Sequence, residues 1–310
     1  MKIRQTVILT LFVIFYTFLS FAQELEETLR VPLHQSKGLN VGALFRSVEY
    51  IPLESTKNAM IQEVDGFWAT DKEIIVFDRR GKAILFFGSD GQFKHKIDRV
   101  PNCAPCNRAD ILFSSVFINK EKRKVYAIYG TAIDNVTMGI FDFDGEFLGQ
   151  KREWYTLEGM GFLGNSILMA NYLFDEKNLN NMQFLHNDDT ITLSLFDPKL
   201  KADYTSFPNR ISKNSYNGKL YWSEPYENKI YSVDSNAHIS SRKLIFPLQY
   251  SLPSDFLTNN FGKINEVLKS TYPHAIFGIT DIMEVKNYLV LNLMSHISLN
   301  GCRLPEIKTV

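Results

Sequence analysis

Two cysteines form the sharpest chemical motif in the chain, in the sequence Cys103-Ala104-Pro105-Cys106. Cys-x-x-Cys pairs carry out thiol–disulfide exchange when the first sulfur lies at the start of a helix that follows a strand. No strand–helix–strand pattern surrounds this motif, and of the metal-ligating residues only His95 lies near it in the sequence, too few for zinc. We predict a local disulfide between Cys103 and Cys106 in an oxidising compartment. A redox centre and a free or metal-bound pair are the alternatives.

A second candidate site is the segment Asp142-Phe143-Asp144-Gly145-Glu146, which resembles part of a calcium-binding loop. The complete loop needs oxygen ligands at positions 1, 3 and 5 and a glutamate at position 12. Glu153 stands at the twelfth position counted from Asp142, but the apolar Phe147 and Leu148 occupy places where ligands or turns belong. The flanking alternation favours a β-hairpin turn, without a metal ion.

The other chemistry-bearing residues form no catalytic set. None of the six histidines makes a close metal pair, and no G-x-S-x-G, P-loop or dinucleotide-binding glycine motif occurs. His274 is expected to be structural unless its segment reaches a ligand-binding face. Trp68, Trp154 and Trp222 could stack on sugar rings, although at least two of them are expected in the core. We predict no catalytic residue, no metal site and no cofactor, and no particular binding residue stands out.

The N-terminus has the organisation of an export signal. Lys2 and Arg4 precede an uncharged apolar run over residues 7–19, and Ser20-Phe21-Ala22 supplies small residues before a cleavage site. We predict a signal peptide over residues 1–22, with an uncleaved anchor as the alternative. No second apolar run is long enough to cross a bilayer, so no stable membrane span is expected after cleavage. The predicted location is the periplasm, the cell surface or the medium.

Charge excludes a nucleic-acid partner. The chain has 34 Lys and Arg residues and 34 Asp and Glu residues. Loss of Lys2 and Arg4 with the signal peptide leaves a net charge of −2, whereas nucleic-acid-binding domains are strongly basic. The partner is therefore expected to be a small molecule, a glycan or a protein.

A sequence pattern of short strands repeats along the chain and predicts the fold. An apolar strand, an Asp-containing turn and a second strand occur around residues 73–93, 124–147, 190–197 and 219–234. Units of this kind, each 40 to 50 residues long, are typical of β-propeller blades. The 24 Phe and 14 Tyr residues favour strands as well. We predict an all-β propeller domain over residues 45–310, after a poorly ordered lead-in over residues 23–44.

The predicted strands build about five blades. The first blade uses residues 61–69, 73–78, 83–88 and 92–97, and the second covers residues 111–151. A helical insertion is expected at about residues 254–269, with Ser254 as N-cap, because apolar residues there recur at helical intervals. Strands resume at 276–285 and 288–294, and no closing strand follows. Closure of the ring would then depend on a strand predicted at Val48–Glu54.

The residues also resemble a known family. The phrases Val48-Glu49-Tyr50-Ile51-Pro52-Leu53-Glu54 and Ile74-Ile75-Val76-Phe77-Asp78, followed later by Tyr272-Pro273-His274, are similar to a six-bladed β-propeller family of exported Bacteroidetes proteins. That family has been catalogued as a domain of unknown function and is related in shape to NHL-repeat propellers. The resemblance implies six blades, so this chain would lack its last blade or end in altered sequence. It implies no catalytic residues.

These observations favour an exported, non-catalytic binding protein whose ligand, a glycan or a peptide, docks on loops of one propeller face, with the helical insertion near residues 254–269 as a lid or docking element. A periplasmic lyase or hydrolase acting on a glycan or peptide-like substrate is the alternative, since propellers host such chemistry. A thiol–disulfide protein built on Cys103 and Cys106 is a third, weaker hypothesis.

Overall fold

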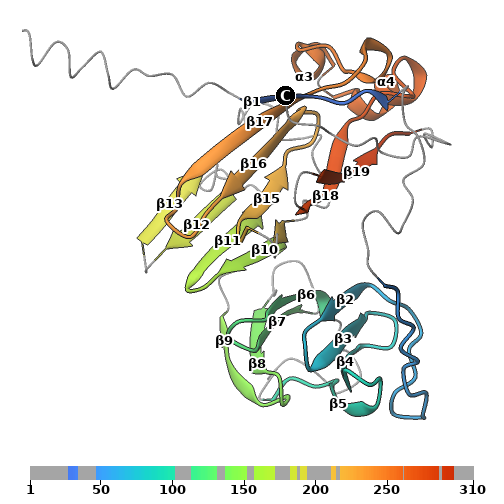
Figure 1. The fold of residues 1–310 in the computed structure, drawn as a ribbon, viewed down its shortest axis with the longest axis vertical. Helices are drawn as coiled ribbons and strands as arrows, with labels where there is room; N and C mark the ends of the chain where they lie inside the picture. The colour runs from blue at the N-terminus through green and yellow to red at the C-terminus, as the bar shows by residue number, and fades with distance from the viewer. Residues whose placement is uncertain are drawn as a thin grey trace, which may run out of the picture.

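The structure is a computed structural model, and it describes residues 27–33, 47–101, 113–130, 137–151, 157–171, 182–186, 189–193, 211–213, 217–260, 262–285 and 288–296. Within these residues the chain is mostly β-strand, arranged in five small sheets (Figure 1). Each sheet is formed by strands that are consecutive in the sequence, with a single exception at the N-terminus. The predicted all-β class is confirmed at this level.

The first three sheets are antiparallel and have four strands each. They contain β2 (Gly66–Ala69), β3 (Glu73–Asp78), β4 (Ala83–Gly88) and β5 (Phe93–Ile97); β6 (Phe113–Asn119), β7 (Lys124–Tyr129), β8 (Thr137–Asp142) and β9 (Phe147–Lys151); and β10 (Leu157–Leu163), β11 (Ser166–Asn171), β12 (Met182–His186) and β13 (Asp189–Leu193). The strands of the first two sheets agree closely with the predicted first and second blades.

The fourth and fifth sheets follow. The fourth contains β14 (Ser212–Lys213), β15 (Leu220–Ser223), β16 (Lys229–Val233) and β17 (Ile239–Ile245), and β1 (Glu27–Arg30) pairs with β17 in parallel. The fifth sheet has two described strands, β18 (Gly278–Val285) and β19 (Tyr288–Met294). Both strands of the fifth sheet lie where the sequence places them.

Successive sheets pack on one another through apolar side chains. Ile75 and Phe86 of the first sheet share a core with Val125 and Phe141 of the second. Similar cores join the second sheet to the third, the third to the fourth and the fourth to the fifth. The first strands of the second to fifth sheets, β6, β10, β14 and β18, contact one another in series. Sheets stacked in chain order with their first strands together form a propeller-like arrangement, although no closed sheet or count of six is seen among the described residues.

The repeated Asp-containing phrase forms the turn between the third and fourth strands of a sheet. In three sheets the same backbone bond closes this turn: Gly88 N–H donates to Gln92 O, Asp142 N–H to Glu146 O, and Asp234 N–H to His238 O. The fourth residue of each turn has a positive φ, +85° at Gly91, +85° at Gly145 and +63° at Ala237. Glycine suits this conformation because it lacks a Cβ. The sequence repeat is therefore a repeat of turn geometry.

The segment over residues 47–65 does not form the predicted strand. Pro52 has no N–H to donate, and Glu54 makes one backbone bond, to Gly91 O at 2.8 Å, rather than a ladder. Leu53, Ala59 and Ile61 instead cover the apolar face of the first sheet that points away from the second sheet. This segment, which we call the strap, shields that face.

The predicted lead-in also contains structure. β1 lies beside β17, and its register runs from Glu27 opposite Arg242 to Arg30 opposite Ile245 (Figure 1). Arg242 Nε contacts Glu27 Oε2 at 2.7 Å, and its Nη1 contacts Glu284 Oε1 of β18 at 3.3 Å. The prediction of a poorly ordered lead-in is wrong here, because four residues are too short to show a strand pattern and are held by tertiary pairing.

The helical insertion is present but divided. It consists of α3 (Phe256–Asn259) and α4 (Ile264–Ser270), preceded by the 3₁₀ turn η4 (Leu248–Tyr250). Gly262, with a φ of +78°, lies between the two helices and cannot continue a right-handed helix there. The N-cap of α3 is Asp255 rather than the predicted Ser254, and its carboxylate accepts a hydrogen bond from Asn259 Nδ2 at 2.7 Å.

Candidate functional site

A hollow of about 430 Å³ lies beside the helical insertion, between the fourth and fifth sheets in chain order. One wall is the segment over residues 248–253, which contains η4 and leads into α3. The other wall is the segment over residues 271–274, which follows α4. The lining of the whole hollow consists of Leu248, Gln249, Ser251, Leu252, Pro253, Thr271, Tyr272, Pro273 and His274. Helices α3 and α4 thus connect the two walls.

Local hydrogen bonds fix the first wall. Pro247 sets the chain direction, and Tyr250 N–H donates to Pro247 O at 2.8 Å, which closes η4. Ser251 Oγ donates to Phe246 O at 3.1 Å and to Pro247 O at 3.3 Å. Ile276 N–H then donates to Tyr250 O at 2.9 Å. This last bond ties the first wall to the chain that follows the second.

Aromatic packing fixes the second wall. The Tyr272 ring meets Phe256 edge to face, with ring centroids 5.7 Å apart and planes at 86°. Phe256 is buried at the start of α3, in a cluster with Ile264, Leu268 and Phe277. Ala275 N–H donates to Tyr272 O at 3.0 Å. The Tyr272 side chain is therefore positioned before any ligand arrives.

The lining lacks acidic residues, lysine and arginine, and two of its polar side chains make no hydrogen bond to a described residue. None of its nine residues is Asp, Glu, Lys or Arg. The side chains of Gln249 and His274 are exposed, and neither makes a hydrogen bond to another residue that the structure describes. Leu248 is 92% exposed at the rim. This partly open, mainly apolar surface with a few polar groups is a candidate ligand site.

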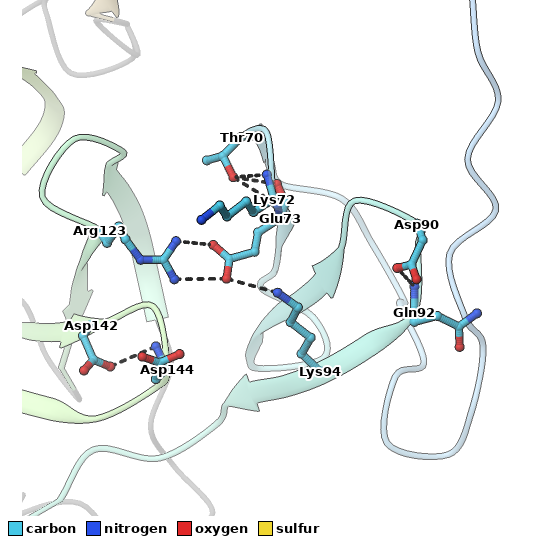
Figure 2. Close-up of polar contacts among 9 residues, drawn as sticks. All are labelled: Thr70, Lys72, Glu73, Asp90, Gln92, Lys94, Arg123, Asp142 and Asp144. Atoms are coloured by element: carbon cyan, nitrogen blue, oxygen red, sulfur yellow. Dashed lines mark hydrogen bonds and ion pairs between the residues drawn. The ribbon is translucent and has the colours of Figure 1, made fainter.

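A second polar region, which we call the clamp, joins the first and second sheets (Figure 2). Glu73 at the start of β3 is 4% exposed. Arg123 holds both of its carboxylate oxygens, with Nη1–Oε2 at 2.8 Å and Nη2–Oε1 at 3.1 Å. Lys94 Nζ lies 3.2 Å from Glu73 Oε1. Burial by itself raises the pKa of Glu73, but hydrogen bonds from Arg123 and Lys94 outweigh it and leave the pKa below its usual value.

His95 lies beside the clamp at the same junction between sheets. Its ring stacks on Phe86 with centroids 4.5 Å apart, and Nε2 is buried without a hydrogen-bond partner among the described residues. Burial lowers the pKa of His95, and the nearby Asp144 carboxylate opposes that shift. A Cβ at Gly145 would lie 3.2 Å from His95 Cδ2. The imidazole thus fills space between the sheets as a neutral aromatic ring.

Several predicted sites are structural. Asp142 Oδ1 accepts a hydrogen bond from the N–H group of Asp144 (Figure 2). It also accepts one from the N–H group of Glu146, so the calcium-like segment is a hairpin turn as predicted. No group of three or more potential metal ligands occurs in the described part of the chain. Trp222 is fully buried and stacks on Tyr231, and Trp68 packs against the core between the first two sheets. The prediction that at least two tryptophans belong to the core is confirmed.

Cys103 and Cys106 lie outside the described residues, as do Cys302 and Trp154. The pairing of the two cysteines stays a prediction.

Of the residues singled out from the sequence, His274 lines the hollow, together with Tyr272 and Pro273 from the phrase that resembles the propeller family. Gln249 and the other wall residues were missed, because short turns carry no periodic pattern. The available signal was three prolines: Pro247 directly before the first wall, Pro253 at its end and Pro273 within the second wall.

The comparisons with known proteins identify the family. The model of a domain of unknown function, DUF4934, matches residues 28–302. The chain belongs to this family. The resemblance to a propeller family of unknown function is thereby confirmed at the level of an uncharacterised family, and no curated protein matches the sequence. No helix in the described ranges reaches the length and apolarity that a bilayer crossing requires.

Solved structures place the fold of this DUF4934 protein. A candidate exported protein from Bacteroides fragilis aligns with a TM-score of 0.65 and 16% identity, over 91% of this chain and 80% of that one. At this identity the likeness shows the fold alone. A catalytically inactive virginiamycin B lyase variant from Staphylococcus aureus aligns with a TM-score of 0.41 and 13% identity, over 78% of this chain and 69% of that one. That score is too low to support an argument about this chain.

Proposed function

We propose that this DUF4934 protein is an exported binding protein, with a β-propeller of the six-bladed type that acts in the periplasm or at the cell surface. The hollow beside the helical insertion is its ligand site. The apolar N-terminal run with its cleavage pattern supports export. The shared fold with a candidate exported protein from Bacteroides fragilis agrees with it.

The main observation in favour of a binding role is that two polar side chains of a preformed hollow, those of Gln249 and His274, make no hydrogen bond to a described residue. Gln249 and His274 come from opposite walls, and the walls are held by the Tyr250–Ile276 backbone bond and the Tyr272–Phe256 contact. Because these bonds fix the backbone of both walls, a ligand has to order the two side chains but not the turns that carry them. The volume lies within the range of small-molecule sites, roughly 300–1,000 Å³.

The lining supports binding over catalysis. Glycoside hydrolysis uses two carboxylates on either side of the scissile bond, and the lining residues supply none. His274 is a general base in type, but no acidic partner belongs to the lining. A lyase or hydrolase would need further groups from elsewhere in the chain. The thiol hypothesis concerns Cys103 and Cys106, and redox titration of the mature chain tests it independently.

Blocking the hollow tests the binding role. Thr271 lines it, and Thr271→Trp should fill it, whereas Thr258→Trp places the same side chain on an exposed position of α3. Both variants and the wild type are melted against a library of glycans, peptides and small metabolites. A ligand at about 100 times its Kd stabilises the folded state by about 2.7 kcal/mol. We expect that shift in the wild type and in Thr258→Trp, and its loss in Thr271→Trp.

A ligand that shifts all three proteins equally would show that the hollow is not the site. A library without any hit would overturn the binding role.

A further inference from the structure

We infer that the hollow binds an uncharged saccharide, an inference that rests on the proposed binding role of the hollow. The first argument is charge. A charged ligand group loses its hydration on burial and needs an opposite charge in return. Elsewhere this chain supplies such pairing, as Arg123 and Lys94 do for Glu73. The hollow offers no Asp, Glu, Lys or Arg, so its lining matches a neutral ligand.

The second argument is hydrogen-bonding capacity. The Gln249 amide both donates and accepts, and the two ring nitrogens of His274 are also hydrogen-bonding groups. Thr271 contributes a hydroxyl, while Ser251 donates its hydrogen to the carbonyls of Phe246 and Pro247 and retains acceptor capacity. Sugar hydroxyls also donate and accept. Each polar group of the lining can therefore pair with a sugar hydroxyl, with Ser251 acting as acceptor.

The third argument is the apolar part of the lining. Leu248, Leu252, Pro253, Tyr272 and Pro273 supply it. A sugar ring presents C–H faces between its hydroxyls, and aromatic and proline rings form matching flat surfaces. The Tyr272 ring is fixed against Phe256, so its contact costs little entropy on binding. Apolar and polar groups lie together on one preformed surface. Such a surface complements a saccharide better than it complements a purely apolar ligand.

An extended peptide fits less well. Peptides bound as strands depend on free main-chain N–H and C=O groups in the site. Here part of the main chain of both walls is already paired internally, through the bonds Tyr250–Pro247, Ser251–Leu248 and Ile276–Tyr250 on one side and Ala275–Tyr272 on the other. These bonds leave no continuous run of free main-chain groups along either wall, so side chains supply most of the recognition.

The test is a binding screen of the mature chain followed by calorimetry. The screen contains neutral gluco-, galacto-, manno-, xylo- and N-acetylglucosamine oligosaccharides, the acidic oligogalacturonates and a set of uncharged peptides. We expect binding to a neutral oligosaccharide and not to its acidic counterpart. Gln249→Ala and His274→Ala should each weaken it at least tenfold. The matched controls Gln92→Ala and His238→Ala, at exposed positions in the turns of the first and fourth sheets, should stay within twofold of the wild type.

The outcomes separate the two levels of the proposal. Binding of peptides or acidic sugars that is lost in Gln249→Ala and His274→Ala would overturn the saccharide inference and leave the binding role standing. Neutral saccharide binding that both substitutions leave unchanged would overturn the assignment to the hollow. Absence of binding to every member of the screen and of the wider library would overturn the inference and the binding role together.

Discussion

The clamp and the hollow use polar side chains in opposite ways. In the clamp, Glu73 is buried and both of its oxygens are held by basic groups from β5 and from the turn before β7. In the hollow, the Gln249 and His274 side chains are exposed and make no hydrogen bond to another described residue. The charged side chains of the clamp join the first sheet to the second, whereas the polar side chains of the hollow are left to solvent or a ligand. The contrast separates groups that stabilise the fold from groups available for function.

The largest expected effect is loss of the clamp carboxylate. Glu73→Ala removes three charge-assisted contacts and should lower the free energy of unfolding by about 2–3 kcal/mol. The cost stays in this range because the Arg123 and Lys94 side chains are 46% and 43% exposed and can be hydrated when unpaired. Urea denaturation measures it. Gln92→Ala, on the exposed turn shown in Figure 2, should change stability by less than about 0.5 kcal/mol. Equal stability of the two variants would mean that the clamp is dispensable.

A smaller effect is expected at the turn that faces His95. Gly145→Ala should cost about 1–2 kcal/mol, because a non-glycine residue at φ +85° is strained. The added Cβ also approaches His95 Cδ2, at 3.2 Å. Gly164→Ala has the same kind of backbone strain, at φ +55°, with nothing within 4 Å of the added atom. Thermal melts should therefore place Gly145→Ala below Gly164→Ala, and the reverse order would rule out a close His95 contact.

The pH dependence of the clamp sharpens the comparison further. The pKa of Glu73 is lower in the folded chain than its ordinary value of 4.5. The unfolded chain therefore binds the proton first as the pH falls, so the stabilisation is complete above about pH 4.5 and is lost as the pH falls through the folded pKa. We expect the stability gap between the wild type and Glu73→Gln to be constant near neutral pH and to shrink below pH 4.5. A gap that widens on acidification would contradict the ion pairing.

The smallest effect is expected in the hollow. Gln249→Ala and His274→Ala remove exposed side chains without described partners, so each should change the free energy of unfolding by less than about 0.5 kcal/mol. Chemical denaturation of both variants, beside Glu73→Ala, completes the comparison. A loss above 1 kcal/mol in either would assign that side chain a structural role and weaken its assignment to ligand binding.

Local sequence was a good guide where a strand and its turn are one unit. The first blade is predicted strand by strand and the second by its range, because short apolar runs bounded by Asp-Gly turns are short-range signals. Long-range contacts were not readable. Nothing in Val48–Glu54 indicated that Leu53 would cover the first sheet instead of extending a sheet, and nothing in Glu27–Arg30 indicated pairing with β17. The walls of the hollow were missed for the same reason, since they meet only after the helices connect them.

By itself, the sequence determined the all-β class, the repeat of strand and turn, the position of the helical insertion and the predicted export signal. These follow from side-chain periodicity, from the backbone freedom of Gly91 and Gly145, and from the short apolar N-terminal run. Only the tertiary structure decided which polar side chains pair with other residues of the chain and which stay without a partner among the described residues. Arg123 meets Glu73 from 50 residues away, and Gln249 and His274 are 25 residues apart on facing walls. A pairing across such distances depends on how the sheets stack, which no local pattern specifies.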